Sequence, residues 1–164
     1  MQLNGKQIVE RDILQNVCVN GIQQQGIDVR LAKVHEVVGG TGGFVPATGK
    51  TQTPCAVEVA CPDGVYDLPV GYYEVTFEEG CKIPADCAMY FKTRSSLVRC
   101  GAEIRSGQFD GGFETDHMGA YLKVELPIKI EKGARVAQAI INETYPVEQE
   151  YLYDGQWQRD NQRN

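Results

Sequence analysis

The segment YFKTRSSLVRCG, residues 90–101, concentrates groups that bind anions. It places Arg94, Ser95, Ser96 and Arg99 among residues that are otherwise mostly apolar or small. If the serines open a helical turn after a strand, their N–H and hydroxyl groups point toward one anion and the arginines supply positive charge. Taken alone, the segment is equally compatible with the solvated face of an ordinary strand.

A second segment, GQFDGGFETDHMGAYL at residues 107–122, carries a carboxylate in a glycine-rich setting. Asp110 is followed by two glycines and then by Phe113. Glycines allow a tight turn and let the backbone approach a ligand closely. An aromatic ring at this spacing can cover the flat face of a sugar or a base. A plain Asp-Gly β-turn would give the same pattern.

Two further polar residues stand inside apolar runs. Asp28 lies in the alternating stretch GIDVRL, and Gln138 lies between two alanines in KGARVAQAIINE. Each taken singly is typical of a structural role, as a turn or cap residue for Asp28 and as a satisfied amide for Gln138. Any function for them depends on the other segments.

The elements that must position these residues are predicted to be strands. Alternating runs such as YYEVTFEEG and AYLKVELPIKI recur with turn signals between them and no helical blocks, which indicates an all-β sandwich, jelly roll or barrel. The start, NGKQIVERDIL, is predicted to be a short helix capped by Asn4. We expect one β domain over residues 1–152 and a flexible polar tail over residues 153–164.

The composition and the charge of the chain exclude some classes of binding partner. A net charge of -6 and a pI near 4.9 argue against a nucleic-acid-binding protein, which would carry a basic face. No apolar run approaches the roughly 18 residues that span a membrane. The first residues, MQLNGKQIVERDIL, carry charges where a signal peptide needs an apolar stretch. We therefore expect a cytoplasmic protein that binds neither nucleic acid nor a membrane.

In their order and spacing, the four segments resemble the motif series of the homotrimeric dUTPase and dCTP deaminase superfamily. QGIDVRL resembles its first motif, TRSSLVRCG its phosphate-binding motif, SGQFDGGFE its third motif and KGARVAQAI its GxRxAQ motif. The likeness runs over residues 22–158, and the tail YDGQWQRDNQRN is similar to the archaeal-type, deaminase-like branch. It implies a distorted jelly-roll subunit with little helix, forming a homotrimer with shared active sites.

The resemblance also implies a reaction, the hydrolysis of dUTP to dUMP and pyrophosphate. Asp110 would orient the water that attacks the α-phosphate, Mg²⁺ would bridge the triphosphate, and Asp28 would serve the metal through water. Phe113, where the family's usual residue is Tyr, would pack on the deoxyribose. The tail would close over an active site, with Trp157 on the base or sugar. The implied substrate-binding residues are Arg94, Ser95, Ser96, Arg99, Gly107, Phe113, Gln138, Trp157 and Arg159.

One position separates the two branches of the superfamily. The deaminases carry a Glu five positions after the glycine that closes the third motif. Gly119 matches that glycine, so Val124 stands at the position, and a valine cannot transfer a proton. A slip of one residue brings Glu125 there, but strand alternation turns it to the opposite face.

We therefore expect a dUTPase. A dCTP deaminase or bifunctional enzyme is the first alternative. A non-catalytic relative that senses nucleotides or binds a protein is the second. His117, inside the insertion at residues 115–118, is expected to be a polar loop residue.

Overall fold

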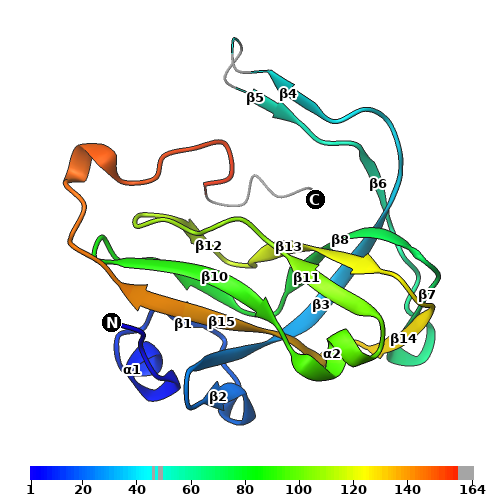
Figure 1. Cartoon of the computed structure of the whole chain (residues 1–164), viewed down its shortest axis with the longest axis horizontal. Coiled ribbons are helices and arrows are strands. Elements are labelled where there is room, and N and C mark those ends of the chain that lie inside the picture. The colour runs from blue at the N-terminus through cyan, green and yellow to red at the C-terminus, as the bar shows by residue number, and fades with distance from the viewer. Residues whose placement is uncertain (46, 48–49, 159–164) are drawn as a thin grey trace.

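The computed structural model describes residues 1–45, 47 and 50–158, and its architecture is mainly β (Figure 1). The largest sheet has the order β10-β15-β3-β8-β13-β11, and every neighbouring pair in it is antiparallel. Its strands are β3 (Gly26–Gly39), β8 (Gly71–Phe77), β10 (Cys87–Thr93), β11 (Ala102–Arg105), β13 (Gly119–Val124) and β15 (Arg135–Glu143), and β2 (Ile22–Gln23) and β6 (Cys55–Glu58) also pair with β3.

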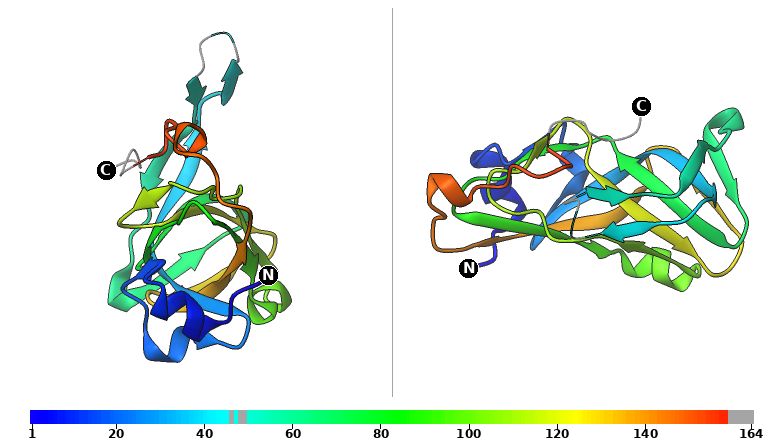
Figure 2. Two further views of the ribbon diagram at one scale, coloured as in Figure 1. Left: turned by 90° about the vertical axis from the view of Figure 1, so that its left-hand side faces the viewer. Right: turned by 90° about the horizontal axis from the view of Figure 1, so that it is seen from above.

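Among the described residues, three smaller sheets accompany this one. They are β1 (Leu14–Gln15) with β9 (Gly80–Lys82) and β12 (Glu114–Thr115), β7 (Val65–Leu68) with β14 (Ile128–Glu131), and β4 (Gly43–Val45) with β5 (Lys50–Gln52). The β4–β5 hairpin projects from the body of the molecule (Figure 2). In the part of the chain that the structure describes, the helical elements are short: α1 (Gly5–Glu10), α2 (Ser95–Arg99) and 3₁₀ turns at Val19–Gly21, Pro62–Gly64 and Gln149–Tyr151. None of the helices in the described residues is long and apolar enough to cross a membrane.

The predicted N-terminal helix is confirmed, and the open alternative at Ser95 is decided. At α1, the Asn4 side chain accepts a hydrogen bond from the Gln7 N–H at 2.9 Å, and the Gln7 side chain accepts one from the Asn4 N–H at 2.9 Å. This reciprocal pair satisfies N–H groups that the first helical turn leaves unpaired. At α2, Ser95 opens a helical turn directly after β10, so the alternative of a continuing strand is wrong for this segment.

The sheet separates an apolar core from a second, polar face. On β8, the side chains of Tyr73, Val75 and Phe77 are buried, whereas the residues between them are only partly buried or exposed. β13 follows the same alternation, with Ala120, Leu122 and Val124 in the core. Residues such as Glu74 on β8 and Tyr121 on β13 therefore belong to the opposite face, because successive side chains alternate across a strand.

β3 joins two parts of the molecule. Its first half pairs with β15, where Asp28 lies opposite Gln138. Its second half pairs with β8, where His35 lies opposite Glu74. The register shifts between Leu31 and Lys33, at the point where the strand passes from one set of neighbours to the other. A strand of 14 residues extends about 46 Å at 3.3 Å per residue, so its two halves contribute to different places.

Candidate active site

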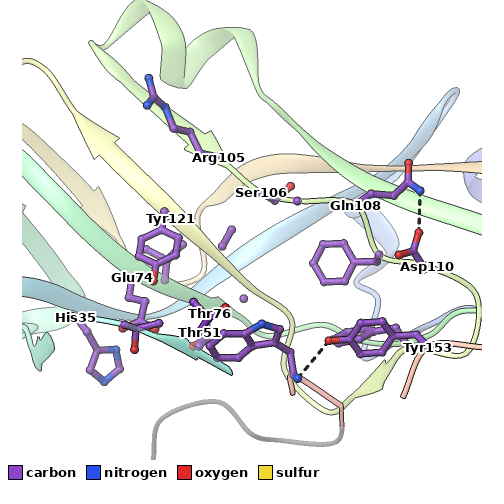
Figure 3. Close-up of a pocket in the computed structure, with 18 residues that line it drawn as sticks. His35, Thr51, Glu74, Thr76, Arg105, Ser106, Gln108, Asp110, Tyr121 and Tyr153 are labelled. Atoms are coloured by element: carbon purple, nitrogen blue, oxygen red, sulfur yellow. Dashed lines mark hydrogen bonds between the residues drawn. The ribbon is translucent and has the colours of Figure 1, made fainter. Parts of the chain in front are cut away.

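A pocket of about 450 Å³ lies on the polar face of the sheet (Figure 3). β8 and β13 contribute to it, as do the connection of residues 106–118 between β11 and β13, residues near β5, and the C-terminal tail. Asp110 lies at one side of the pocket, while Glu74 and His35 lie at the other. Segments far apart in the chain thus enclose one site.

Asp110 is held by the backbone on either side of it. Phe109 forms a bridge to Met89 of β10 through two backbone hydrogen bonds of 2.9 and 2.7 Å. The Asp110 carboxylate is exposed, and its Oδ1 accepts a hydrogen bond from the Gln108 side chain at 2.8 Å. A carboxylate with a fixed backbone and oxygen lone pairs facing a pocket can hold and deprotonate a water molecule.

The two glycines after Asp110 permit close approaches, but the approaching partner is protein. Gly112 has a φ of +94°, and a Cβ at that position would lie 2.9 Å from the Cβ of Leu152. A Cβ on Gly111 would lie 3.1 Å from Ala85. The Gly111 carbonyl also accepts a hydrogen bond from the Tyr153 N–H at 2.9 Å. The glycine pair therefore lets the tail dock beside the candidate catalytic carboxylate.

Aromatic rings line the pocket beside Asp110. Phe113 packs edge-to-face against Phe109 and Tyr153, with ring centroids 5.2 and 5.3 Å apart. Trp157 follows on the tail, and its backbone N–H donates to the Tyr153 hydroxyl at 3.2 Å. Such rings offer apolar faces to a sugar or a base. Phe113 and Trp157 were predicted as binding residues, but Tyr153 was missed as a pocket residue, although it begins the tail segment YDGQWQ on which the resemblance partly rests.

A row of four polar residues crosses the sheet beneath the pocket. His35, Glu74, Tyr121 and Arg105 lie directly opposite one another on β3, β8, β13 and β11, and all four line the pocket. This row could not be predicted from the sequence, because it depends on the register of four strands that are distant in the chain.

The predicted phosphate-binding residues gather elsewhere, around Asp28. The Asp28 carboxylate is 3% exposed and lies 3.3 Å from Arg94 Nε and 3.4 Å from Arg135 Nη1. Burial raises the pKa of Asp28, and the two guanidinium groups partly oppose this rise. Gln138 lies opposite Asp28 on β15, and Arg94 also donates to the Arg135 carbonyl at 3.1 Å. The first, second and fourth motifs therefore meet in one cluster.

Ser95, Ser96 and Arg99 extend this cluster on α2, and all three are exposed. None of the three lines the pocket of Asp110, nor do Arg94 and Gln138. Arg94 follows the end of β10 and lies five positions after Met89, which bridges Phe109, or about 16 Å at 3.3 Å per residue. Within one chain, the anion-binding cluster therefore lies apart from Asp110. Arg159, also predicted to bind substrate, lies outside the described residues.

The surroundings of Asp28 do not suit the metal role predicted for it. Two guanidinium groups face its carboxylate, and their positive charge opposes a divalent cation there. Within the described part of the chain, no cluster of three or more His, Cys, Asp or Glu side chains could hold a metal ion. Asp110, an exposed carboxylate that lines the pocket, is of the kind that holds Mg²⁺ together with substrate phosphates.

The structure shows the surroundings of Val124 and Glu125, the two candidates for the position that separates dUTPases from deaminases. Val124 is buried in the core, and Glu125 is exposed and accepts a hydrogen bond from Lys123, which lowers its pKa. Neither residue lines the pocket. His117 lies in the connection before β13, with Nδ1 3.1 Å from the Phe77 carbonyl oxygen, and it does not line the pocket either.

Comparisons with known proteins agree on the family. Residues 3–144 match the dCTP deaminase-like family. The chain is 32% identical over 149 residues to the deoxyuridine 5'-triphosphate nucleotidohydrolase of Methanocaldococcus jannaschii, covering 88% of this chain and 94% of that protein. It is 33% identical over 143 residues to a protein of Methanosarcina mazei named "Probable deoxyuridine 5'-triphosphate nucleotidohydrolase", covering 85% and 82%.

A solved structure supports the fold. The dCTP deaminase from Agrobacterium tumefaciens superposes with a TM-score of 0.64 at 18% identity, covering 87% of this chain and 47% of that chain. This chain thus spans about half the length of that solved protein, and the likeness concerns the fold. Together with the matches in sequence, it confirms the predicted superfamily.

Proposed function

The chain belongs to the dCTP deaminase-like family, and we propose that within this family it is a dUTP diphosphatase, which hydrolyses dUTP to dUMP and pyrophosphate. The observation that carries this proposal is Asp110, a carboxylate at the edge of an aromatic-lined pocket. Relatives named as dUTP nucleotidohydrolases at about 30% identity over most of the chain support the substrate.

In this proposal Asp110 is the general base. It holds the attacking water, takes a proton as the water oxygen bonds to the α-phosphorus, and pyrophosphate leaves from the opposite side. Phe113 packs against the deoxyribose. Gly107 lines the pocket, and a Cβ there would meet nothing within 4 Å, so the backbone beside it is open to the edge of the pyrimidine. Trp157 covers the base or sugar from the tail.

The triphosphate needs a second set of residues. It carries about four negative charges, which require neutralisation during in-line attack. We assign this role to Arg94, Ser95 and Ser96. We place Gln138 and Arg99 in the same set. Asp28 is a positioning residue that holds Arg94 and Arg135 in place. Mg²⁺ bound with the triphosphate would supply further positive charge, and Arg159 of the tail is proposed to reach the γ-phosphate.

The separation of the two sets of residues supports a homotrimer of jelly-roll subunits with shared sites. Asp110 and the aromatic pocket would come from one subunit, and the cluster around Arg94 from its neighbour. The reason for this proposal is the separation of about 16 Å along β10 between Arg94 and the residue that bridges Phe109, together with the absence of Arg94 from the pocket of Asp110. In a closed ring of identical subunits, each subunit makes the same contact with its neighbour, so every site receives both sets of residues.

The direct test is to identify the products. We expect the purified protein with Mg²⁺ to convert dUTP into dUMP and pyrophosphate and to leave dCTP unchanged. Formation of dUTP or dUMP from dCTP would instead demonstrate the deaminase or bifunctional alternative. Absence of turnover with both nucleotides, together with retained nucleotide binding, would support the non-catalytic relative.

One observation favours deamination of dCTP as a second candidate function. Although Val124 and Glu125 do not reach the pocket, Glu74 lines it from the neighbouring strand β8. A carboxylate there could activate water against the ring carbon that bears the amino group, with ammonia as the leaving product. If dCTP is consumed, Glu74→Gln should abolish this activity and leave dUTP hydrolysis measurable.

A further inference from the structure

The C-terminal tail docks on the body of its own chain through several side-chain and backbone contacts. Gln158 is bonded to both sides of the glycine-rich turn: its Nε2 donates to the Gly112 carbonyl at 2.7 Å, and its Oε1 accepts from the Glu114 N–H at 2.9 Å. Tyr153 packs on Phe113 and donates its N–H to Gly111. The tail is therefore seated beside the Asp110 of the same polypeptide.

A second attachment joins the tail to the projecting hairpin. Gln156 Nε2 donates to the Thr51 carbonyl at 2.9 Å, and its Oε1 accepts from the Thr51 N–H at 2.9 Å. The side-chain amide thus pairs with β5 as a neighbouring strand would, because it carries both a donor and an acceptor. A two-stranded hairpin is marginally stable alone, so this pairing helps to fix β5. Thr51 and Thr53 line the same pocket as Trp157.

We propose that Gln156 is a positioning residue that clasps the tail to β5 and encloses the pocket within a single subunit. The clasp holds Trp157 over the bound nucleotide, where the indole stacks on a planar base. This places the tail over its own subunit's Asp110, whereas the phosphate-binding cluster comes from a neighbour. The identity of the nucleotide rests on the proposed function, but the clasp itself does not.

Fluorescence tests the clasp without using activity. Trp157 is the single tryptophan of the chain, and it is 38% exposed. In the ligand-free protein, Gln156→Ala should increase the acrylamide quenching constant of Trp157 at least about twofold, because local opening exposes the indole. Gln149→Ala, a change of the same residue type at an exposed position of the preceding 3₁₀ turn, should leave quenching unchanged. Equal quenching in the wild type and Gln156→Ala would overturn the clasp.

Kinetics give a second readout. Gln156 does not touch the reacting atoms in this proposal, so Gln156→Ala should raise KM for dUTP by up to about tenfold, the equivalent of losing two ordinary hydrogen bonds, and change kcat less than KM. An unchanged KM would contradict a role in holding the nucleotide. If the wild type fails to hydrolyse dUTP, the proposed function fails, and the fluorescence result still decides the clasp.

Co-expression of two inactive variants tests closure within one subunit. One variant is Asp110→Asn with its tail intact, and the other lacks residues 153–164. If each tail covers its own Asp110, mixed oligomers purified through two different tags contain no site with both groups, and turnover stays at the level of the separate variants. Recovery toward about one third of wild-type turnover, the share of sites in a mixed trimer that two subunits would complete together, would overturn closure in cis.

Discussion

Among single residues, the proposed mechanism depends most on Asp110 and Asp28, and their surroundings give them different roles. Asp110 is exposed in a pocket, with one hydrogen bond from Gln108 to its carboxylate. Asp28 is buried between two guanidinium groups. The first can accept a proton from water, while the second is already engaged with charged protein groups. Sequence motifs grouped both as active-site acids, and only the fold separates them.

Replacing Asp110 with Asn should reduce kcat for dUTP at least about a hundredfold, since general-base catalysis contributes 10² to 10⁴-fold. Nucleotide binding should persist, because the amide keeps the shape of the side chain. Asp116→Asn changes a carboxylate in the same connection that does not line the pocket, and it should leave kcat near the wild-type value. Steady-state kinetics and calorimetric binding check both variants, and near-normal turnover by Asp110→Asn would remove Asp110 from the mechanism.

Asp28 should give stability a distinctive pH dependence. Burial holds its folded-state pKa above the unfolded value of about 3.9, so the folded state binds this proton more tightly. The contribution is therefore fully present below the unfolded pKa and is lost as pH rises through the folded pKa. The free energy of unfolding of the wild type minus that of Asp28→Asn should fall as the pH rises from about 4 toward neutral. Urea denaturation across this range measures it, and a difference that rises with pH would mean that the arginines outweigh burial.

At the scale of elements, the connection between β11 and β13 is built around one left-handed residue. Gly112→Ala introduces a Cβ at a φ of +94° and within 2.9 Å of Leu152. We expect a loss of about 1–2 kcal/mol from the backbone conformation, and loosening of the tail beyond it. Gly107→Ala is the matched control, because its Cβ would meet nothing within 4 Å. Denaturant unfolding compares the two, and equal stabilities would show that the tail does not depend on this close approach.

The same elements indicate what could be predicted from the sequence. The helical turn at Ser95 and the glycine-flanked Asp110 were recognisable because each depends on neighbours in the chain. The polar row containing Glu74 and Tyr121 was not, since it exists only through the register of four strands and a register shift near Leu31 in β3. Pairing register is decided by tertiary packing, and no local pattern records it.

For the molecule as a whole, the proposed catalysis requires more than one copy of the chain. The pocket of Asp110 and the cluster of Asp28 and Arg94 are each well formed, but they are separate within one chain. We therefore expect sedimentation to give a trimer of the 18.2 kDa chain, and we expect dilution that dissociates it to abolish turnover. A monomer with full activity would contradict shared sites.

Complementation between two defective subunits measures most directly whether Asp110 and the phosphate-binding cluster meet between subunits. Ser95→Glu places a negative charge where the triphosphate is proposed to bind, yet an acidic residue suits the first turn of α2, so the fold should persist. Neither this variant nor Asp110→Asn should turn over dUTP alone. Mixed trimers of the two should recover about one third of wild-type turnover, because one of the three sites in each mixed trimer pairs an intact Asp110 with an intact neighbouring cluster. Mixed trimers that remain inactive would show that Asp110 and the phosphate-binding cluster do not meet between subunits.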